Sequence, residues 1–338
     1  MKLCRFKTLT LPEVGQQVGQ QVGQASRLSA GRLALGATNA GGTPDSAGGT
    51  PAPLSEELLK TKQGDIRIGL VADDSTVLDL AAAGVTQMFR LLEDKDSLRR
   101  VADFSREKLP RFEMSEIELL APLERQEVWA AGVTYLRSKK ARMEESDFSA
   151  TAYDRVYESE RPELFFKSLP DKVAAPGGVV GIRRDSRWSV PEPELALVLN
   201  SQGKIVGFTI GNDMSSRDIE GENLLYLPQA KIYQHSCSLG PWIETGASEA
   251  EARDWKIVME IKRGGQSVYD GETSVGQIKR GFEELAGFLF RSQTFPHGAV
   301  LLTGTGLVPP DSFALQEGDV VEIQISGIGM LRNKVTVV

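Results

Sequence analysis

Cysteine and histidine are scarce in this sequence, with two residues of each among 338. Cys4 and Cys237 stand far apart and show no metal-ligand spacing, so neither a disulfide framework nor a zinc site is predicted. Thiols used so sparingly are typical of proteins in a reducing compartment. We therefore expect a cytoplasmic protein.

Long apolar runs and an excess of positive charge are absent as well. No apolar stretch approaches the roughly 20 residues of a membrane span, and the opening MKLCRFKTLTLPEVGQ lacks the apolar run of a signal peptide. The formal net charge is -7, whereas nucleic acids and anionic membranes attract basic surfaces. The sequence thus predicts neither nucleic acid nor membrane as a partner and favours a small-molecule ligand.

Residues 13–53 differ in composition from the rest of the chain. VGQQVGQQVGQ repeats with a period of four residues, and AGGTP occurs twice. Such a segment buries too little apolar surface to offset the entropy lost on ordering, so we predict a disordered insertion. The flanking stretches LCRFKTLTL and GDIRIGLVADD alternate as half-buried strands do, which indicates that the insertion interrupts a small N-terminal sheet.

Two domains of different character are expected. Residues 75–122 show helical periodicity, for example in LAAAGVTQMFRLLED, and would complete a small domain over residues 1–122. Residues 123–338 contain short apolar runs and one good helical pattern, SVGQIKRGFEELAGFLF, which predicts a mixed, β-rich α+β domain. The predicted strands are VWAAGVTY, ELFFKSL, LALVL, KIVGFTIG, WKIVMEIKR, AVLLTGTG and DVVEIQISGIG.

An unusual pair of acids lies in one of these runs, SVPEPELALVLN. In an extended strand Glu192 and Glu194 share a face, with Cα atoms about 6 to 7 Å apart. Two like charges so close are costly to desolvate, and a divalent cation such as magnesium, calcium or manganese would compensate them. The alternative is that both acids face water or pair with nearby arginines.

Other polar residues lie at the ends of apolar runs. Asp213 ends the run in FTIGNDMSSRD and Glu163 opens ELFFKSL, although each alone would serve equally as a turn or cap residue. Lys231, in LPQAKIYQHSCSLGPW, could carry a proton or stabilise an enolate if it lay beside a dication. In LLTGTGLVPP, small residues would let the backbone and Thr303 or Thr305 approach a carboxylate. The G-x-G pieces lack the helix and acid of a dinucleotide fingerprint, so no nicotinamide site is predicted.

Taken together, PELFFK, the E-x-E pair, GNDMSSRDIEGENLLYLPQAK and TGTG resemble the fumarylacetoacetate hydrolase superfamily. The resemblance runs from about Val128 to the C-terminus, and LCRFKT with DIRIGLV is similar to that family's small N-terminal domain. It implies a mixed β-roll that assembles as a homodimer or homotetramer. It also implies Glu192, Glu194 and Asp213 as ligands of magnesium or manganese.

Within the superfamily, GVTYLRSKKARMEES, YDRVYESERPELFFK and NLLYLPQAK look most like the 2-keto-3-deoxy-D-arabinonate dehydratase branch. This implies dehydration of a 2-keto-3-deoxy sugar acid, such as the arabinonate or xylonate, to 2,5-dioxopentanoate. Glu163 and Lys231 would then act in proton transfer, and Thr305 would correspond to the family's threonine near the substrate. Tyr135 and Arg137 could contact the substrate's carboxylate or distal hydroxyls, since a guanidinium binds carboxylate bidentately.

Hydrolysis of acylpyruvates or 2,4-diketo acids is the alternative activity. Carbon–carbon hydrolases of the superfamily place a water-activating histidine in the loop after the first core strand, and here Gly132–Glu145 contains none. This departure weakens the hydrolytic interpretation. Decarboxylation or isomerisation of a keto acid and a non-catalytic carboxylate-binding role remain further alternatives, which product analysis would separate.

Overall fold

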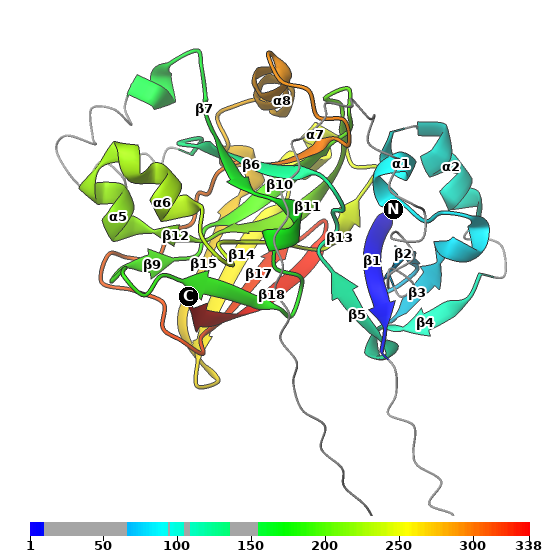
Figure 1. The fold of residues 1–338 in the computed structure, drawn as a ribbon, viewed down its shortest axis with the longest axis horizontal. Helices are drawn as coiled ribbons and strands as arrows, with labels where there is room; N and C mark the ends of the chain where they lie inside the picture. The colour runs from blue at the N-terminus through cyan, green and yellow to red at the C-terminus, as the bar shows by residue number, and fades with distance from the viewer. Residues whose placement is uncertain (10–65, 94, 105–108, 136–154) are drawn as a thin grey trace, which may run out of the picture. The chain divides into compact units, whose positions relative to one another are not determined.

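The fold is taken from a computed structural model that describes residues 1–9, 66–93, 95–104, 109–135 and 155–338. The predicted insertion at residues 13–53 and the candidate residue Arg137 lie outside the described residues. The strands are β1 Lys2–Thr8, β2 Ile66–Val71, β3 Thr76–Asp79, β4 Arg111–Glu113, β5 Ile117–Leu120, β6 Glu127–Gly132, β7 Glu163–Ser168, β8 Val179–Ile182, β9 Ser189–Val190, β10 Pro193–Leu199, β11 Ile205–Asp213, β12 Ser215–Ser216, β13 Cys237–Glu244, β14 Lys256–Arg263, β15 Gln266–Ser274, β16 Ala299–Leu302, β17 Val320–Ile325 and β18 Gly329–Val337. The helices, with η for 3-10 turns, are η2 Leu80–Ala83, α1 Met88–Leu92, α2 Lys95–Phe104, η3 Met114–Glu116, η4 Pro170–Lys172, α5 Arg217–Glu222, η5 Leu224–Tyr226, α6 Leu227–Lys231, α7 Glu249–Arg253, η6 Val275–Gln277 and α8 Phe282–Phe290 (Figure 1).

Two large sheets organise the described residues. The first contains eleven strands, with the order β4-β3-β2-β1-β13-β11-β10-β16-β6-β7 and β5 paired to β1. The second has five strands in the order β15-β14-β17-β18-β8. Most pairs are antiparallel, while β16 with β6 and β18 with β8 are parallel. The strand-rich, mixed architecture agrees with the β-rich α+β class that the sequence predicts.

The main core lies between β10 and β11 of the first sheet and β14 and β17 of the second. Alternate residues of each strand supply it, as the two-residue period of a strand requires. From β10 these are Leu195, Leu197 and Leu199, and from β14 they are Ile257, Met259 and Ile261. The other face of β10 carries Glu194, Ala196 and Val198, so the acid lies on the face opposite the main core.

The two strands predicted around residues 13–53 are confirmed. β1 and β2 pair antiparallel over six residues, from Lys2↔Val71 to Lys7↔Ile66. β1 also pairs with β13 through Lys2↔Glu244 and Leu3↔Ile243, so the N-terminal strands extend the large sheet rather than forming a separate small one. The division into domains at residues 122 and 123 stays a prediction.

Two helix predictions need correction. LAAAGVTQMFRLLED does not form one helix, because Gly84 adopts a left-handed φ of 81° and separates η2 from α1. The helix predicted over residues 274–290 begins only at Phe282. Of the residues before it, Ser274 ends β15 and Val275–Gln277 form η6, with the Ser274 hydroxyl accepting a hydrogen bond from the Gly276 amide. The predicted helix is thus divided into a strand end, a 3-10 turn and the shorter helix α8.

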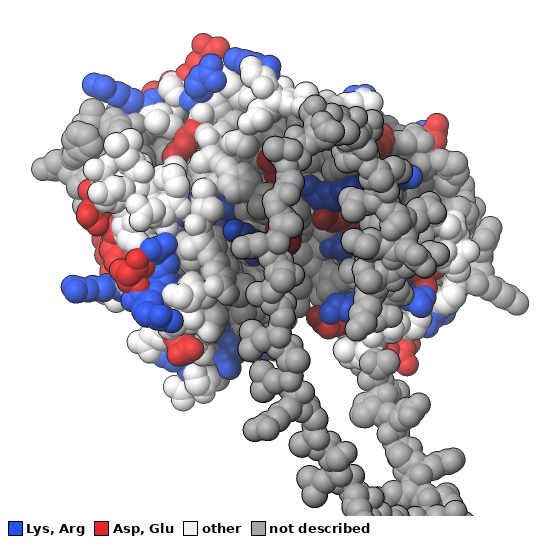
Figure 2. All heavy atoms as spheres, in the orientation of Figure 1, with Lys and Arg blue, Asp and Glu red and all other residues white. Residues whose placement is uncertain are grey.

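The described surface in Figure 2 carries charges of both signs. On the described part of the face in Figure 2, basic and acidic side chains are interspersed rather than gathered into one patch. No helix of the described ranges is long and apolar enough to cross a membrane. Cys4 and Cys237 are both buried free thiols.

Candidate metal centre

The structure gathers three of the predicted acids at one point. Glu192, Glu194 and Asp213 each offer a carboxylate oxygen, and these oxygens all lie within 4.8 Å of one another. Their side chains are buried, with residue exposures of 2%, 1% and 1%. The alternative that Glu192 and Glu194 face water is therefore wrong.

Backbone pairing between β10 and β11 fixes this cluster. The register places Glu194 opposite Gly211 and Pro193 opposite Asn212, so Asp213 comes next to Glu192. The Asp213 amide donates to the Glu192 carbonyl at 3.0 Å, and the Glu192 amide donates to the Asn212 side-chain oxygen at 3.2 Å. Strand pairing, supported by the Asn212 side chain, thus brings the backbones of the acidic residues together.

Lys231 meets the acids as the sequence suggested. It ends α6, is fully buried, and its Nζ donates to Glu192 Oε2 at 2.7 Å and to Asp213 Oδ2 at 3.2 Å. A third hydrogen bond goes to Ser215 Oγ at 2.5 Å. Lys231 is thus a buried lysine, and an ammonium beside two carboxylates is a candidate proton donor.

Two further buried cations were missed by the sequence analysis. Arg217 donates to Glu192 Oε1 at 2.8 Å, and Lys167 Nζ lies 2.5 Å from Asp213 Oδ1. Both residues lie in motifs that carried the family resemblance, Arg217 in GNDMSSRDIEGENLLYLPQAK and Lys167 in PELFFK, where it interrupts an apolar run. The signal that could have identified Lys167 is its alternation with Glu163 and Phe165, which places all three on one face of β7.

Glu194 differs from the other two acids. Its Oε2 accepts a hydrogen bond from the Gly304 amide at 2.6 Å, and no ion pair links it to a lysine or arginine of the described residues. Burial, followed by the charges of Asp213 and Glu192, raises the pKa of Glu194 well above its ordinary value.

A divalent cation fits this donor set. Three hard carboxylate oxygens within reach of one another are the ligands that magnesium, manganese and calcium prefer. A cation there would also supply Glu194 with the positive charge that the surrounding lysines and Arg217 give to the other acids.

A small hollow opens over the acids. Gly132, Phe165, Gly304 and Thr305 line it together with the three acids. Glu163 starts β7 opposite Gly132, and a Cβ atom at Gly132 would lie 1.9 Å from Glu163 Oε2. The carboxylate of Glu163 therefore occupies the space that the missing side chain leaves beside Gly132; Glu163 itself is not among the residues lining the hollow, so its contact with a substrate stays a prediction.

Thr305 and Tyr135, two of the residues predicted to bind substrate, hold the protein's own structure together beside the acids. The Thr305 hydroxyl donates to the Pro193 carbonyl at 3.0 Å and the Leu307 carbonyl at 3.1 Å, and so holds the start of β10 beside the hollow. Tyr135 is fully buried, and its ring packs against Gly306. Burial, followed by the charge of Glu194, raises its pKa. Tyr135 is not among the residues lining the hollow, so its direct contact with a substrate stays a prediction.

The sheet architecture and buried acidic centre are those of one enzyme family. Residues 127–336 match the family model described as fumarylacetoacetate (FAA) hydrolase C-terminal. The chain belongs to the fumarylacetoacetate hydrolase family, which confirms the resemblance drawn from its motifs. The predicted fold class is confirmed with it.

Three similar proteins within the family have named activities. A probable 2-keto-3-deoxyxylonate dehydratase of Haloferax volcanii is 44% identical over 278 residues, covering 78% of this chain and 94% of the relative. The 2-dehydro-3-deoxy-D-arabinonate dehydratase of Saccharolobus solfataricus is 38% identical over 266 residues, with coverages of 77% and 89%. A structure of 2-keto-3-deoxy-D-arabinonate dehydratase complexed with magnesium and 2,5-dioxopentanoate matches with a TM-score of 0.68 at 32% identity, covering 82% of this chain and 97% of that chain. All three similar proteins are dehydratases by name.

Proposed function

We propose that this protein is a magnesium-dependent dehydratase that removes one water from a 2-keto-3-deoxy pentonate and forms 2,5-dioxopentanoate. The observation that carries the proposal is the buried acidic triad with Lys231 bonded to two of its members. The identity of 44% to a probable 2-keto-3-deoxyxylonate dehydratase supports the reaction type. The magnesium and 2,5-dioxopentanoate in the similar structure support the cofactor and the product.

The metal would be held by Glu192, Glu194 and Asp213, and as a Lewis acid it would polarise the substrate's 2-keto group and make the C3 protons more acidic. The fixed amide of Gly304 and the guanidinium of Arg217 hold two of these carboxylates in place. Because the centre is buried, its charges act in a medium of low dielectric, where they are stronger than in water.

Glu163 or Lys231 transfers the proton from C3. Glu163, or Lys231 in its neutral form, takes the C3 proton; where Glu163 is the base, the Lys231 ammonium donates a hydrogen bond to the negative charge that develops on the 2-oxygen. A protonated partner assists the C4 hydroxyl in leaving as water. A proton then leaves C5 and one returns to C3, and the resulting enol becomes the C5 aldehyde. The sum of these steps is the loss of one water.

Hydrolysis of acylpyruvates uses the same acids and is the competing function. It needs a group that activates water, and the segment Gly132–Glu145 after β6 lacks the histidine that serves this purpose in the hydrolases. Glu163 would then have to act as the hydrolytic base.

The deciding experiment is mass spectrometry of reactions with a panel of 2-keto-3-deoxy-arabinonate, 2-keto-3-deoxy-xylonate and acylpyruvates. Protein freed of metal with EDTA is compared with the same protein after addition of Mg²⁺ or Mn²⁺. Loss of one water from a pentonate, restored by Mg²⁺, is the expected result. Cleavage of an acylpyruvate into two acids, with the pentonates untouched, would replace the dehydratase by the hydrolase.

Assembly and location belong to the same proposal. A small 2-keto acid is the expected partner, and the cytoplasm the expected location. A homodimer or homotetramer is expected in solution, which light scattering coupled to gel filtration would measure.

A further inference from the structure

Lys167 is a side chain at this centre to which the proposed chemistry gives no role, although it belongs to the PELFFK motif. It lies in β7 and is fully buried. Its Nζ has three oxygen partners: it forms an ion pair with Asp213 Oδ1 at 2.5 Å and donates hydrogen bonds to the Lys231 carbonyl at 2.5 Å and the Met214 carbonyl at 3.0 Å. A lysine ammonium carries three donors and no acceptor, so oxygens are its natural partners.

We infer that Lys167 is a positioning residue that holds the metal ligand Asp213 and the proton-transfer residue Lys231 in fixed relation to each other. The inference rests on the proposed function. Each of the two partners is held by Lys167 through a different kind of group, a carboxylate in Asp213 and a backbone carbonyl in Lys231.

The contact with Asp213 fixes the orientation of its carboxylate. One oxygen forms an ion pair with Lys167 and the other accepts a hydrogen bond from Lys231, so buried cations lie on both sides of the carboxylate. Outer contacts of this kind orient metal ligands, and their loss commonly weakens metal binding.

The contact with Lys231 fixes its backbone. Lys231 is the last residue of α6, and the final carbonyls of a helix have no partner within the helix. Lys167 supplies that partner. The Phe165 ring, on the same face of β7, lies 5.9 Å from Lys231 Nζ, so β7 contacts Lys231 at both its backbone and its ammonium end.

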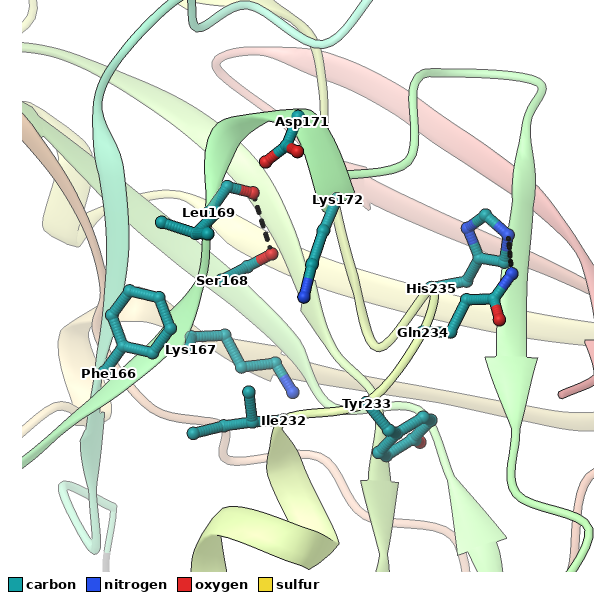
Figure 3. Close-up of a pocket in the computed structure, with 10 residues that line it drawn as sticks. All are labelled: Phe166, Lys167, Ser168, Leu169, Asp171, Lys172, Ile232, Tyr233, Gln234 and His235. Carbon is teal, nitrogen blue, oxygen red and sulfur yellow. Dashed lines mark hydrogen bonds between the residues drawn. The ribbon is translucent and has the colours of Figure 1, made fainter. Parts of the chain in front are cut away.

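A matched control lies close by. Lys167 and Lys172 line the same cavity of about 460 Å³, which is drawn in Figure 3 with Tyr233 and His235 on its other side. Lys172 is exposed, and its ammonium makes no hydrogen bond or ion pair with the described residues. Removing the charge of Lys172 therefore changes the cavity but leaves the acidic centre untouched.

The test compares wild type, Lys167→Met and Lys172→Met in two measurements. Electron paramagnetic resonance titration gives the affinity for Mn²⁺ alone, and steady-state kinetics at saturating metal give kcat and KM for the pentonate. For Lys167→Met we expect Mn²⁺ affinity to fall about tenfold to a hundredfold. We also expect a lower kcat that excess metal does not restore, because Lys231 is displaced as well. Lys172→Met should match wild type in both.

Thermal unfolding monitored by circular dichroism shows whether each variant is folded at the assay temperature. A folded Lys167→Met protein with wild-type Mn²⁺ affinity and kcat would overturn the inference, since a merely structural lysine changes only stability. If Lys167→Met does not fold, Lys167→Gln, which retains hydrogen-bond donors without the charge, is judged by the same criteria. Failure of the wild-type protein to bind Mn²⁺ or dehydrate a pentonate would instead overturn the proposed function.

Discussion

Glu192 accepts hydrogen bonds at both carboxylate oxygens, from Arg217 at 2.8 Å and from Lys231 at 2.7 Å. An amide in its place would turn an NH₂ group toward one of these cations and would carry no charge for a metal. We expect Glu192→Gln to lose bound metal and to lower turnover at least about a hundredfold. Metal content after desalting and the dehydration rate measure the two effects.

Glu272→Gln serves as the control, because Glu272 lies exposed on β15 and, among the described residues, pairs only with Lys256 at 3.7 Å. It should leave both quantities at wild-type values. Full activity in Glu192→Gln would contradict the assignment of Glu192 as a metal ligand.

Cys4 gives a second prediction at the residue scale, far from the acids. Burial raises the pKa of its thiol from 9.0 to about 12, and a hydrogen bond from the Gly69 backbone only partly opposes the shift. The pKa of this thiol is higher in the folded than in the unfolded protein. The contribution of the neutral thiol to stability is therefore complete below about pH 9 and is lost as the pH rises toward 12. The free energy of unfolding should fall by at most about 1.4 kcal/mol per pH unit in this window.

Urea unfolding across this pH window, in wild type and in Cys4→Ala, measures the effect. Other groups that titrate at alkaline pH are common to both proteins, so the difference between the two slopes isolates the thiol. Equal slopes would show that the Cys4 thiol does not control the loss of stability.

At the scale of elements, the pairing of β6 with β7 places Gly132 opposite Glu163. A methyl group at Gly132 would meet the end of a flexible side chain, Glu163 Oε2, at 1.9 Å. Gly132→Ala should therefore cost little stability but push the Glu163 carboxylate away from the hollow. We expect metal binding to be kept and kcat to fall about a hundredfold, the contribution typical of a general acid or base.

Isothermal titration with Mn²⁺ and steady-state kinetics separate these effects. Gly287→Ala is the control, since nothing lies within 4 Å of a Cβ atom at this exposed position of α8. Wild-type kcat in Gly132→Ala would remove Glu163 from the mechanism.

The sequence predicts the acids of this site well and their partners less well. The two-residue period of an extended chain places Glu192 and Glu194 on one face, and Asp213 ends the apolar run that forms β11; both are local features. Lys167 and Arg217 escape such reasoning, because their partners lie 46 and 25 residues away in sequence and are brought near only by strand pairing. The helix predicted from residue 274 begins only at Phe282, because Val275–Gln277 form the separate 3-10 turn η6.

At the scale of the whole molecule, the ion pair between β7 and β11 reveals the curvature of the large sheet. Three strands, β10, β16 and β6, separate them in the pairing order. In a flat sheet they would be about 19 Å apart, at the usual spacing of about 4.8 Å per strand. The 2.5 Å distance from Lys167 to Asp213 requires the sheet to coil until its edge strand faces the end of β11. The closure that forms the site is thus a property of the entire sheet.

The same sheet allows a test of residues 13–53. β1 and β2 are neighbours, with Lys7 opposite Ile66, so the chain between them only has to connect two adjacent strand ends. Deleting residues 13–53 leaves ample length for this connection. We expect turnover to stay within about twofold of wild type. Unfolding should become more costly by about 1 kcal/mol, because a shorter flexible loop loses less entropy on closure.

Urea unfolding and steady-state kinetics of the deletion variant measure both quantities. A large loss of stability would mean that residues 13–53 are packed against the rest of the protein, contrary to the disorder predicted from their composition. A loss of turnover at unchanged stability would mean that they contribute to the active site. The expected outcome would show that residues 13–53 are needed neither for folding nor for chemistry, since the register of β1 against β2 and β13 is set by strand pairing on both sides.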